Sequence, residues 1–297
     1  MRHITCRNHD NGFMCNFSED DFSPFILASV DGIYSVKNKV TISENTMTDG
    51  GTYQGANAQI RNIVLTLLEN PNPNDSFVYD QANRDVLYSL FQKGTQGTFV
   101  YYENGTARQI NYYCESIVRE KAGKRPFVIS LLCPDPMFHD IFDTIVAMAN
   151  WIAEFEFVHE FKAEGEEIGF RSAEKSVNIV NDRATGNIGM KIIVDAKGAA
   201  RNITITRIES DEHITIGSSG KNLDLVAGDR LIITTGVNDK HVRLVRNGKT
   251  TEINEYVTED SEFIQIDNGN NNIAYSADSG DENLIITIHY KFDYEGV

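Results

Sequence analysis

The sequence has few of the residues that mark cross-linked, secreted or membrane-spanning proteins. Only four cysteines occur in 297 residues, with no Cys-x-x-Cys spacing, so we expect free thiols and no disulfide framework. The longest weakly charged stretch, residues 144–153, is shorter than the ~18–20 residues of a membrane span. No apolar run follows the N-terminal charges, so no signal peptide is expected.

Positive charge is also scarce. Lys and Arg number 27 against 43 Asp and Glu, a formal net charge of −16, which disfavours binding to nucleic acid and to anionic lipid surfaces. The excess of acidic residues is uneven, because the net charge is −4 over residues 1–140 and −12 over residues 141–297. Hydrophobic residues at 41% and aromatic residues at 10% are ordinary for a folded chain, and the length favours two domains.

Proline is absent from the second half of the chain. All six prolines and all four cysteines lie before residue 137, and the last two prolines form the corner Cys133-Pro134-Asp135-Pro136. Neither a helix nor a central strand passes through such a corner. We therefore predict an N-terminal domain over residues 1–137 and a C-terminal domain over residues 138–297.

Residues 1–137 show a mixed pattern. Apolar residues alternate over residues 60–67 and run continuously over residues 127–132, and both segments predict strands. Residues 80–94 place apolar side chains on one helical face and end in glycine, which predicts the one main helix. Two β-rich runs flank Asn104-Gly105 over residues 97–114, which predicts a long hairpin because both turn residues tolerate positive φ.

Residues 138–297 contain short β-rich runs at regular spacing, typical of an antiparallel sandwich. A short helix is expected over residues 143–153, a strand over residues 154–161 and a loop over residues 268–272. The predicted strands of the sandwich span residues 187–194, 203–208, 223–226, 230–235, 242–245, 262–266 and 284–290.

Two sets of residues resemble metal or phosphate sites. A zinc site would use the soft ligands His3, Cys6, His9 and Cys15, but a strand would point His3 and Cys6 to opposite faces, so ordinary strand residues are favoured. Residues 247–250 resemble the end of a phosphate-binding loop, but no glycine begins that loop, which favours a hairpin turn.

Residues 267–278 have the length of a calcium-binding loop. The sixth position is Asn272 instead of glycine and the twelfth is Asp278 instead of glutamate, so calcium is disfavoured. Spacing alone also permits Glu154 and Glu156 as a glycosidase pair, although alternation with phenylalanines favours a charged strand face. No nucleophile or dinucleotide motif occurs, so we expect no enzyme, no cofactor and no metal.

Three aromatic residues offer a carbohydrate-binding alternative. Trp151, Tyr256 and Tyr275 would stack on sugar rings if they lay on an exposed face of the sandwich. Aromatic residues in a domain of this kind are more often part of the core, so the core is favoured.

Several segments, taken in order, resemble the distal tail protein family of long-tailed, non-contractile bacteriophages, the siphophages. The resemblance covers nearly the whole chain. It is carried by residues 25–33, 61–65, 91–97, 129–136, 155–157, 227–235, 267–271 and 294–297.

The resemblance implies a mainly β protein. It implies an α+β N-terminal domain with one main helix, which forms a hexameric ring at the tail tip, and a C-terminal galectin-like β-sandwich that forms a peripheral platform. The ring would connect the tail tube protein to tail-tip proteins at the tail tip of the virion, and the protein would be synthesised in the cytoplasm of a bacterial host. The alternative is a lectin-like protein that binds a host-surface glycan, and an enzyme ranks third.

A ring needs a surface that contacts the next copy. The predicted hairpin offers Tyr101, Tyr102, Tyr112 and Tyr113, which place phenol rings on both faces, and only one face can enter the subunit's own core. We interpret these tyrosines as the candidate subunit interface. An internal sheet covered on both faces is equally compatible with the pattern.

Overall fold

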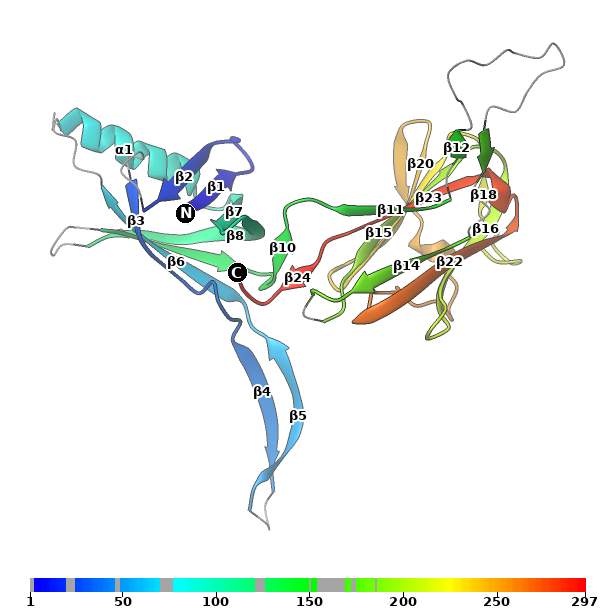
Figure 1. Cartoon of the computed structure of the whole chain (residues 1–297), viewed down its shortest axis with the longest axis horizontal. Coiled ribbons are helices and arrows are strands. Elements are labelled where there is room, and N and C mark those ends of the chain that lie inside the picture. Colours follow the sequence, from blue (N-terminus) through cyan, green and yellow to red (C-terminus); the bar gives the residue numbers. More distant parts are fainter. Residues whose placement is uncertain are drawn as a thin grey trace. The chain divides into compact units, whose positions relative to one another are not determined.

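A computed structural model describes residues 3–19, 25–45, 49–69, 77–120, 126–149, 151–153, 169–171, 175–184 and 186–297. The chain forms two compact units, Met1–Ile141 with Asp293–Val297 and Phe142–Phe292 (Figure 1). Strands dominate both units, which confirms the mainly β prediction. No helix in the described residues is long and apolar enough to cross a membrane.

The first unit is built on a nine-stranded sheet in the order β24-β10-β8-β7-β1-β2-β3-β6-β9. The long strand β8 pairs with β7 along its first half and with β9 along its second half, so seven of these strands close into a barrel. The strands are β1 (His3–Asn8), β2 (Met14–Ser18), β3 (Phe25–Asp31), β6 (Arg61–Glu69), β7 (Gln96–Glu103), β8 (Thr106–Arg119), β9 (Phe127–Cys133), β10 (Phe138–Asp140) and β24 (Asp293–Tyr294).

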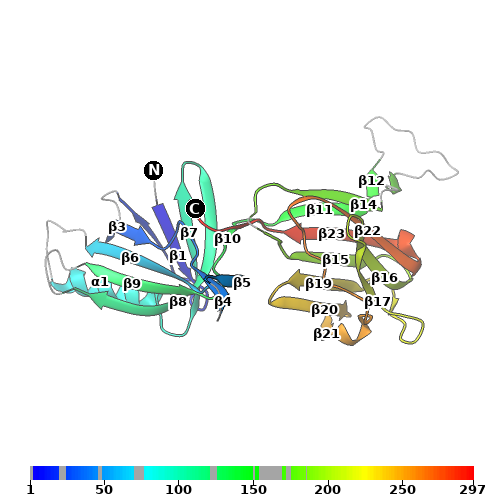
Figure 2. The same cartoon turned by 90° about the horizontal axis from the view of Figure 1, so that it is seen from below.

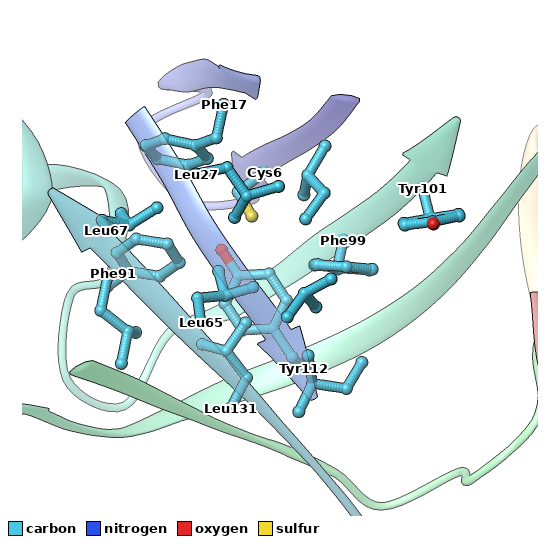
Figure 3. Close-up of a cluster of buried hydrophobic side chains, with 14 of the residues drawn as sticks. Cys6, Phe17, Leu27, Leu65, Leu67, Phe91, Phe99, Tyr101, Tyr112 and Leu131 are labelled. Atoms are coloured by element: carbon cyan, nitrogen blue, oxygen red, sulfur yellow. The ribbon is translucent and has the colours of Figure 1, made fainter. Parts of the chain in front are cut away.

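The barrel core follows from alternation along the strands. Ile63, Leu65 and Leu67 of β6 are fully buried, while the residues between them face outward. Helix α1 (Phe77–Leu90) adds Leu87 and Leu90 to the same cluster, part of which Figure 3 shows. The predicted helix is confirmed, although it begins and ends a few residues earlier than the sequence pattern indicated.

The C-terminal end of α1 is capped from another strand. The buried Asn8 side chain donates from Nδ2 to the carbonyl oxygens of Ser89 and Leu90 and to the hydroxyl of Thr95. The last carbonyls of a helix have no partner within the helix, so this contact satisfies groups that would otherwise lose hydrogen bonds. It fixes α1 against β1.

The predicted hairpin of β7 and β8 is present. Asn104 and Gly105 both have positive φ, 51° and 81°, as a two-residue hairpin turn of this hand requires. A second Asn-Gly turn, at Asn247 and Gly248 with φ of 53° and 74°, joins β20 to β21 in the second unit. The hairpin interpretation of residues 247–250 is therefore confirmed.

Most strands of the second unit form two antiparallel sheets, seen as two layers in Figure 2. One has the order β11-β23-β15-β19-β20-β21, and the other β14-β22-β16-β17 with β18 beside β16. The first sheet comprises β11 (Thr144–Ala149), β15 (Met190–Ala196), β19 (Arg230–Gly236), β20 (Asp239–Arg246), β21 (Lys249–Glu252) and β23 (Leu284–Tyr290). The second comprises β14 (Ser176–Asn181), β16 (Ala200–Arg207), β17 (Glu212–Ile216), β18 (Asp224–Leu225) and β22 (Gly269–Ser279).

The remaining elements are short. A two-stranded sheet forms from β12 (Trp151–Ala153) and β13 (Gly169–Arg171), and single turns of 3-10 helix form at η1 (Asn254–Tyr256) and η2 (Asp281–Asn283). In the first unit, β4 (Asn38–Glu44) and β5 (Gly51–Ala58) form a separate hairpin.

Three predictions for the second half were wrong. Residues 143–153 form β11 and β12 instead of a helix, because the β-branched Ile145 and Val146 pair with β23. Within residues 262–266, only Ile266 pairs, in an isolated bridge with Ile188. Residues 268–272 are not a loop, since β22 begins at Gly269.

Strand β22 is polar at its start because Asn271 has a structural role. Asn271 is fully buried, and its Nδ2 atom donates to the carbonyl oxygens of Ile179, Asp267 and Gly269. These bonds satisfy main-chain groups where the strand begins. Most of residues 267–278, which have the length of a calcium-binding loop, is therefore a paired strand. The strand predicted over residues 154–161 lies outside the described residues.

The division between the units lies near the predicted boundary at residue 137. The first unit extends to Ile141 and also includes Asp293–Val297, which the sequence pattern assigned to the second domain. Whether residues 1–137 and 138–297 fold separately stays a prediction.

Candidate assembly interface

The four predicted interface tyrosines divide between the two faces of the β7–β8 hairpin. Tyr101 and Tyr112 point into the barrel and are 2% and 1% exposed (Figure 3). The hydroxyl of Tyr101 donates to Glu103 Oε2 at 3.0 Å. The hydroxyl of Tyr112 is buried without a hydrogen-bond partner in the described residues, and burial raises its pKa well above the usual value.

Tyr102 and Tyr113 lie on the opposite face of the hairpin. Tyr102 is half-buried, and its ring stacks on the imidazole of His3 with centroids 4.3 Å apart. Tyr113 is 40% exposed. The structure thus places two of the predicted residues in the core and leaves two with surface available for contact.

A second candidate surface was not found from the sequence. It is the hairpin of β4 and β5, which pairs with no other strand in the described part of the chain and extends away from β3 and β6 in Figure 1. Almost every residue of both strands is exposed. An isolated two-stranded hairpin is marginally stable in water, so this one requires an additional contact.

The two faces of the β4–β5 hairpin differ in polarity. The register pairs Val40 with Ala56 and Ile42 with Tyr53, and directly paired residues share a face. Val40, Ile42 and Tyr53 are 52%, 58% and 65% exposed, so this is an uncovered apolar face. We call it the apolar hairpin face.

The opposite face of the same hairpin is polar. It carries Lys39, Thr41 and Ser43 from β4 and Asn57 and Thr52 from β5. One wet face and one apolar face are typical of a strand pair that covers another protein surface. The alternation of polar and apolar residues over residues 38–44 is the sequence signal that could have found this hairpin.

The soft ligands near the N-terminus are not gathered around one point. His3 stacks on Tyr102, and the ring nitrogen Nε2 of His9 lies 2.6 Å from Thr98 Oγ1. Cys6 and Cys15 are opposite each other in the β1–β2 ladder, both with free thiols whose pKa is raised mainly by burial. No metal-binding group of His, Cys, Asp and Glu occurs in the described residues.

The aromatic residues of the carbohydrate alternative are not gathered on an open face. Tyr275 is buried in the sandwich, and the Lys221 ammonium lies 4.2 Å from the centre of the Tyr256 ring. Trp151 belongs to β12, whose side chains the structure does not describe.

A pocket of about 210 Å³ in the first unit is smaller than typical small-molecule sites.

Solved structures of phage tail proteins share the fold of this chain. The SPP1 Dit (gp 19.1) protein, described as a paradigm of the hub adsorption apparatus in phages that infect Gram-positive bacteria, matches with a TM-score of 0.66 at 10% identity, over 98% of this chain and 99% of that chain. A chain of the phage P2 baseplate, in its activated conformation with Ca, matches with a TM-score of 0.51 at 10% identity, over 100% of both chains.

A family match covers the second unit. Residues 183–294 match the family described as "Siphovirus-type tail component, C-terminal domain". No curated protein matches the chain. The fold of the whole chain and the family of its C-terminal part therefore point to the same class of proteins.

Proposed function

We propose that this chain is a distal tail protein of siphophages, a structural hub of the tail tip whose first unit assembles into a ring. The observation that carries the ring is the apolar hairpin face. Its three large side chains are exposed on an otherwise isolated hairpin, and a neighbouring copy would remove them from water.

We propose a ring of six copies, closed by a head-to-tail contact. In such a ring, the contact surface of one copy differs from the surface that it meets on the next copy. The apolar hairpin face would supply one surface. Tyr102 and Tyr113, on the outer face of the β7–β8 hairpin, remain candidates for a contact. Tyr101 and Tyr112 contribute to the core of the subunit itself.

The proposed partners follow from this role. The ring would bind the tail tube protein on one side and tail-tip proteins on the other, in a virion whose parts are made in the bacterial cytoplasm. The second unit would form the peripheral platform. The role is structural and needs no catalytic group. No observation in the described residues favours the lectin-like alternative.

Substitution on the two faces of the β4–β5 hairpin tests the ring. Ile42→Asp introduces a charge into the apolar hairpin face, whereas Thr41→Asp introduces the same charge on the polar face of the same strand. Burying an unpaired carboxylate at an interface is strongly unfavourable, so the Ile42 variant should dissociate to monomers and the Thr41 variant should remain a ring.

Molar mass by light scattering after size exclusion measures both variants. Equal far-UV circular dichroism spectra of the two variants would show that the Ile42 substitution leaves the fold of the subunit intact. A ring that persists in Ile42→Asp would remove the apolar hairpin face from the contact.

A further inference from the structure

The last five residues of the chain, Asp293–Val297, lie in the first unit although the residues before them form the second. Strand β24 pairs with β10 in the register Phe138 to Tyr294 and His139 to Asp293. The segment therefore adds the ninth strand to the sheet of the first unit.

Two arginines of the first unit hold the main chain of this segment. The buried Arg61 donates to the carbonyl oxygens of Gly32 at 2.7 Å, Pro136 at 2.6 Å and Glu295. Arg108 donates to the carbonyl oxygen of Gly296. Hydrogen bonds from a charged donor are stronger than neutral ones, and a buried guanidinium that loses an acceptor is destabilising.

Side chains of the segment add further contacts. The Tyr294 ring lies under the Arg108 guanidinium at 3.7 Å, and its hydroxyl donates to Asp140 Oδ1 at 3.2 Å. Asp293 Oδ1 lies 2.7 Å from His139 Nδ1.

The end of the segment fits closely against the loop after β3. The main-chain nitrogen of Val297 donates to the carbonyl oxygen of Ile33 at 3.2 Å. At Gly296 there is no room for a side chain, because a Cβ atom would overlap the carbonyl oxygen of Tyr34. This fit makes recognition of the segment dependent on glycine at that position.

We propose that the first unit carries a binding surface for an extended peptide, built by Arg61, Arg108, His139 and the carbonyl oxygen of Ile33, and that the chain's own residues Asp293–Val297 occupy it as a strap. The strap completes the first unit only after the second unit has been synthesised. Both chain connections to the second unit, at Ile141 and at Phe292, are thereby anchored in the first unit. The strap acts within a single copy of the chain and does not depend on ring assembly.

A chain that ends after Phe292 tests the strap. Calorimetry should show a first-unit transition at least about 5 °C lower than in the full chain. The shortened chain loses the contacts of Arg61 with Glu295, of Arg108 with Gly296 and of His139 with Asp293, each of which involves a charged group. The transition of the second unit should be unchanged.

Added peptide gives a direct measure of binding. The peptide Asp-Tyr-Glu-Gly-Val should raise the first-unit transition of the shortened chain in proportion to the logarithm of its concentration, whereas the peptide with alanine in place of glycine should not. In the full chain, Gly296→Ala should lower the same transition, because a Cβ atom at this position would overlap the carbonyl oxygen of Tyr34.

A shortened chain that folds only when the peptide is added would also support the strap. A shortened chain whose first unit melts at the same temperature as the full chain would overturn it. If the two peptides raised the first-unit transition by the same amount, the proposal of a surface specific for this segment would be overturned.

Discussion

At the scale of single residues, Tyr112 combines a ring that packs in the core with a hydroxyl group that makes no hydrogen bond in the described residues. Its ring packs in the barrel core beside Gly97, where a Cβ atom would overlap the tyrosine ring. Its hydroxyl has no partner in the described residues. The ring therefore stabilises the barrel through packing, and the hydroxyl has a desolvation cost.

Tyr112→Phe should accordingly leave the unfolding free energy of the first unit unchanged or raise it by up to about 1 kcal/mol. Tyr101→Phe is the matched control, because it removes a hydroxyl that donates to Glu103 and should lower the free energy by about 1 kcal/mol. Denaturant titration measures both variants. A larger loss in Tyr112→Phe than in Tyr101→Phe would contradict this view of the core.

His139 gives the first unit a dependence on pH. Burial alone lowers its pKa, but Asp135 at 3.1 Å and Asp293 at 2.7 Å raise the pKa to about 9. The unfolded value is about 6.5. Because the folded pKa is the higher one, the stabilisation is fully present below about pH 6.5 and is lost as the pH rises through 9.

Between pH 7 and pH 9.5 the first unit should therefore lose about 2 kcal/mol of unfolding free energy through this group. His139→Gln keeps an amide in place of the ring and should make the profile less steep over that interval. The slope that remains comes from buried thiols such as Cys6 and Cys15, whose pKa burial also raises. If the unfolding free energy of the variant fell as steeply with pH as that of the original chain, a group other than His139 would be responsible for the pH dependence.

At the scale of elements, local patterns predicted the strands that alternate cleanly. Strand β23 has the bounds that the pattern of residues 284–290 gave, and the Asn104-Gly105 turn joins β7 to β8 as predicted. Strand β22 was missed, because its start is a run of asparagines. The buried amide of Asn271 makes such a run part of a sheet, and only tertiary contacts reveal this.

The candidate interface was predicted only in part, for a related reason. Two tyrosines on each strand of the β7–β8 hairpin indicated that both faces are aromatic, but not which face is buried. The structure shows that Tyr101 and Tyr112 face the core. The apolar hairpin face was not predicted, because alternation along a strand does not show whether its apolar face is covered, and the exposure of Val40 and Ile42 depends on what surrounds them.

At the scale of the whole molecule, the family resemblance was the strongest prediction. Residues 183–294 match the C-terminal domain of the siphovirus-type tail component, and the whole chain shares its fold with the SPP1 Dit protein. The two-part layout was visible in proline and charge distribution. The return of residues 293–297 to the first unit was not, because a contact between Arg61 and Glu295 leaves no local signal in either segment. Contacts this distant in sequence arise from topology.

The central claim is that copies of this chain form a ring, and the molar mass of the purified full chain tests it most directly. Light scattering coupled to size exclusion should give six times the 33.3 kDa chain mass. The molar mass should stay constant on dilution down to the concentration at which the apolar hairpin face of each copy dissociates from the next copy. A mass of one chain at every concentration would contradict the account.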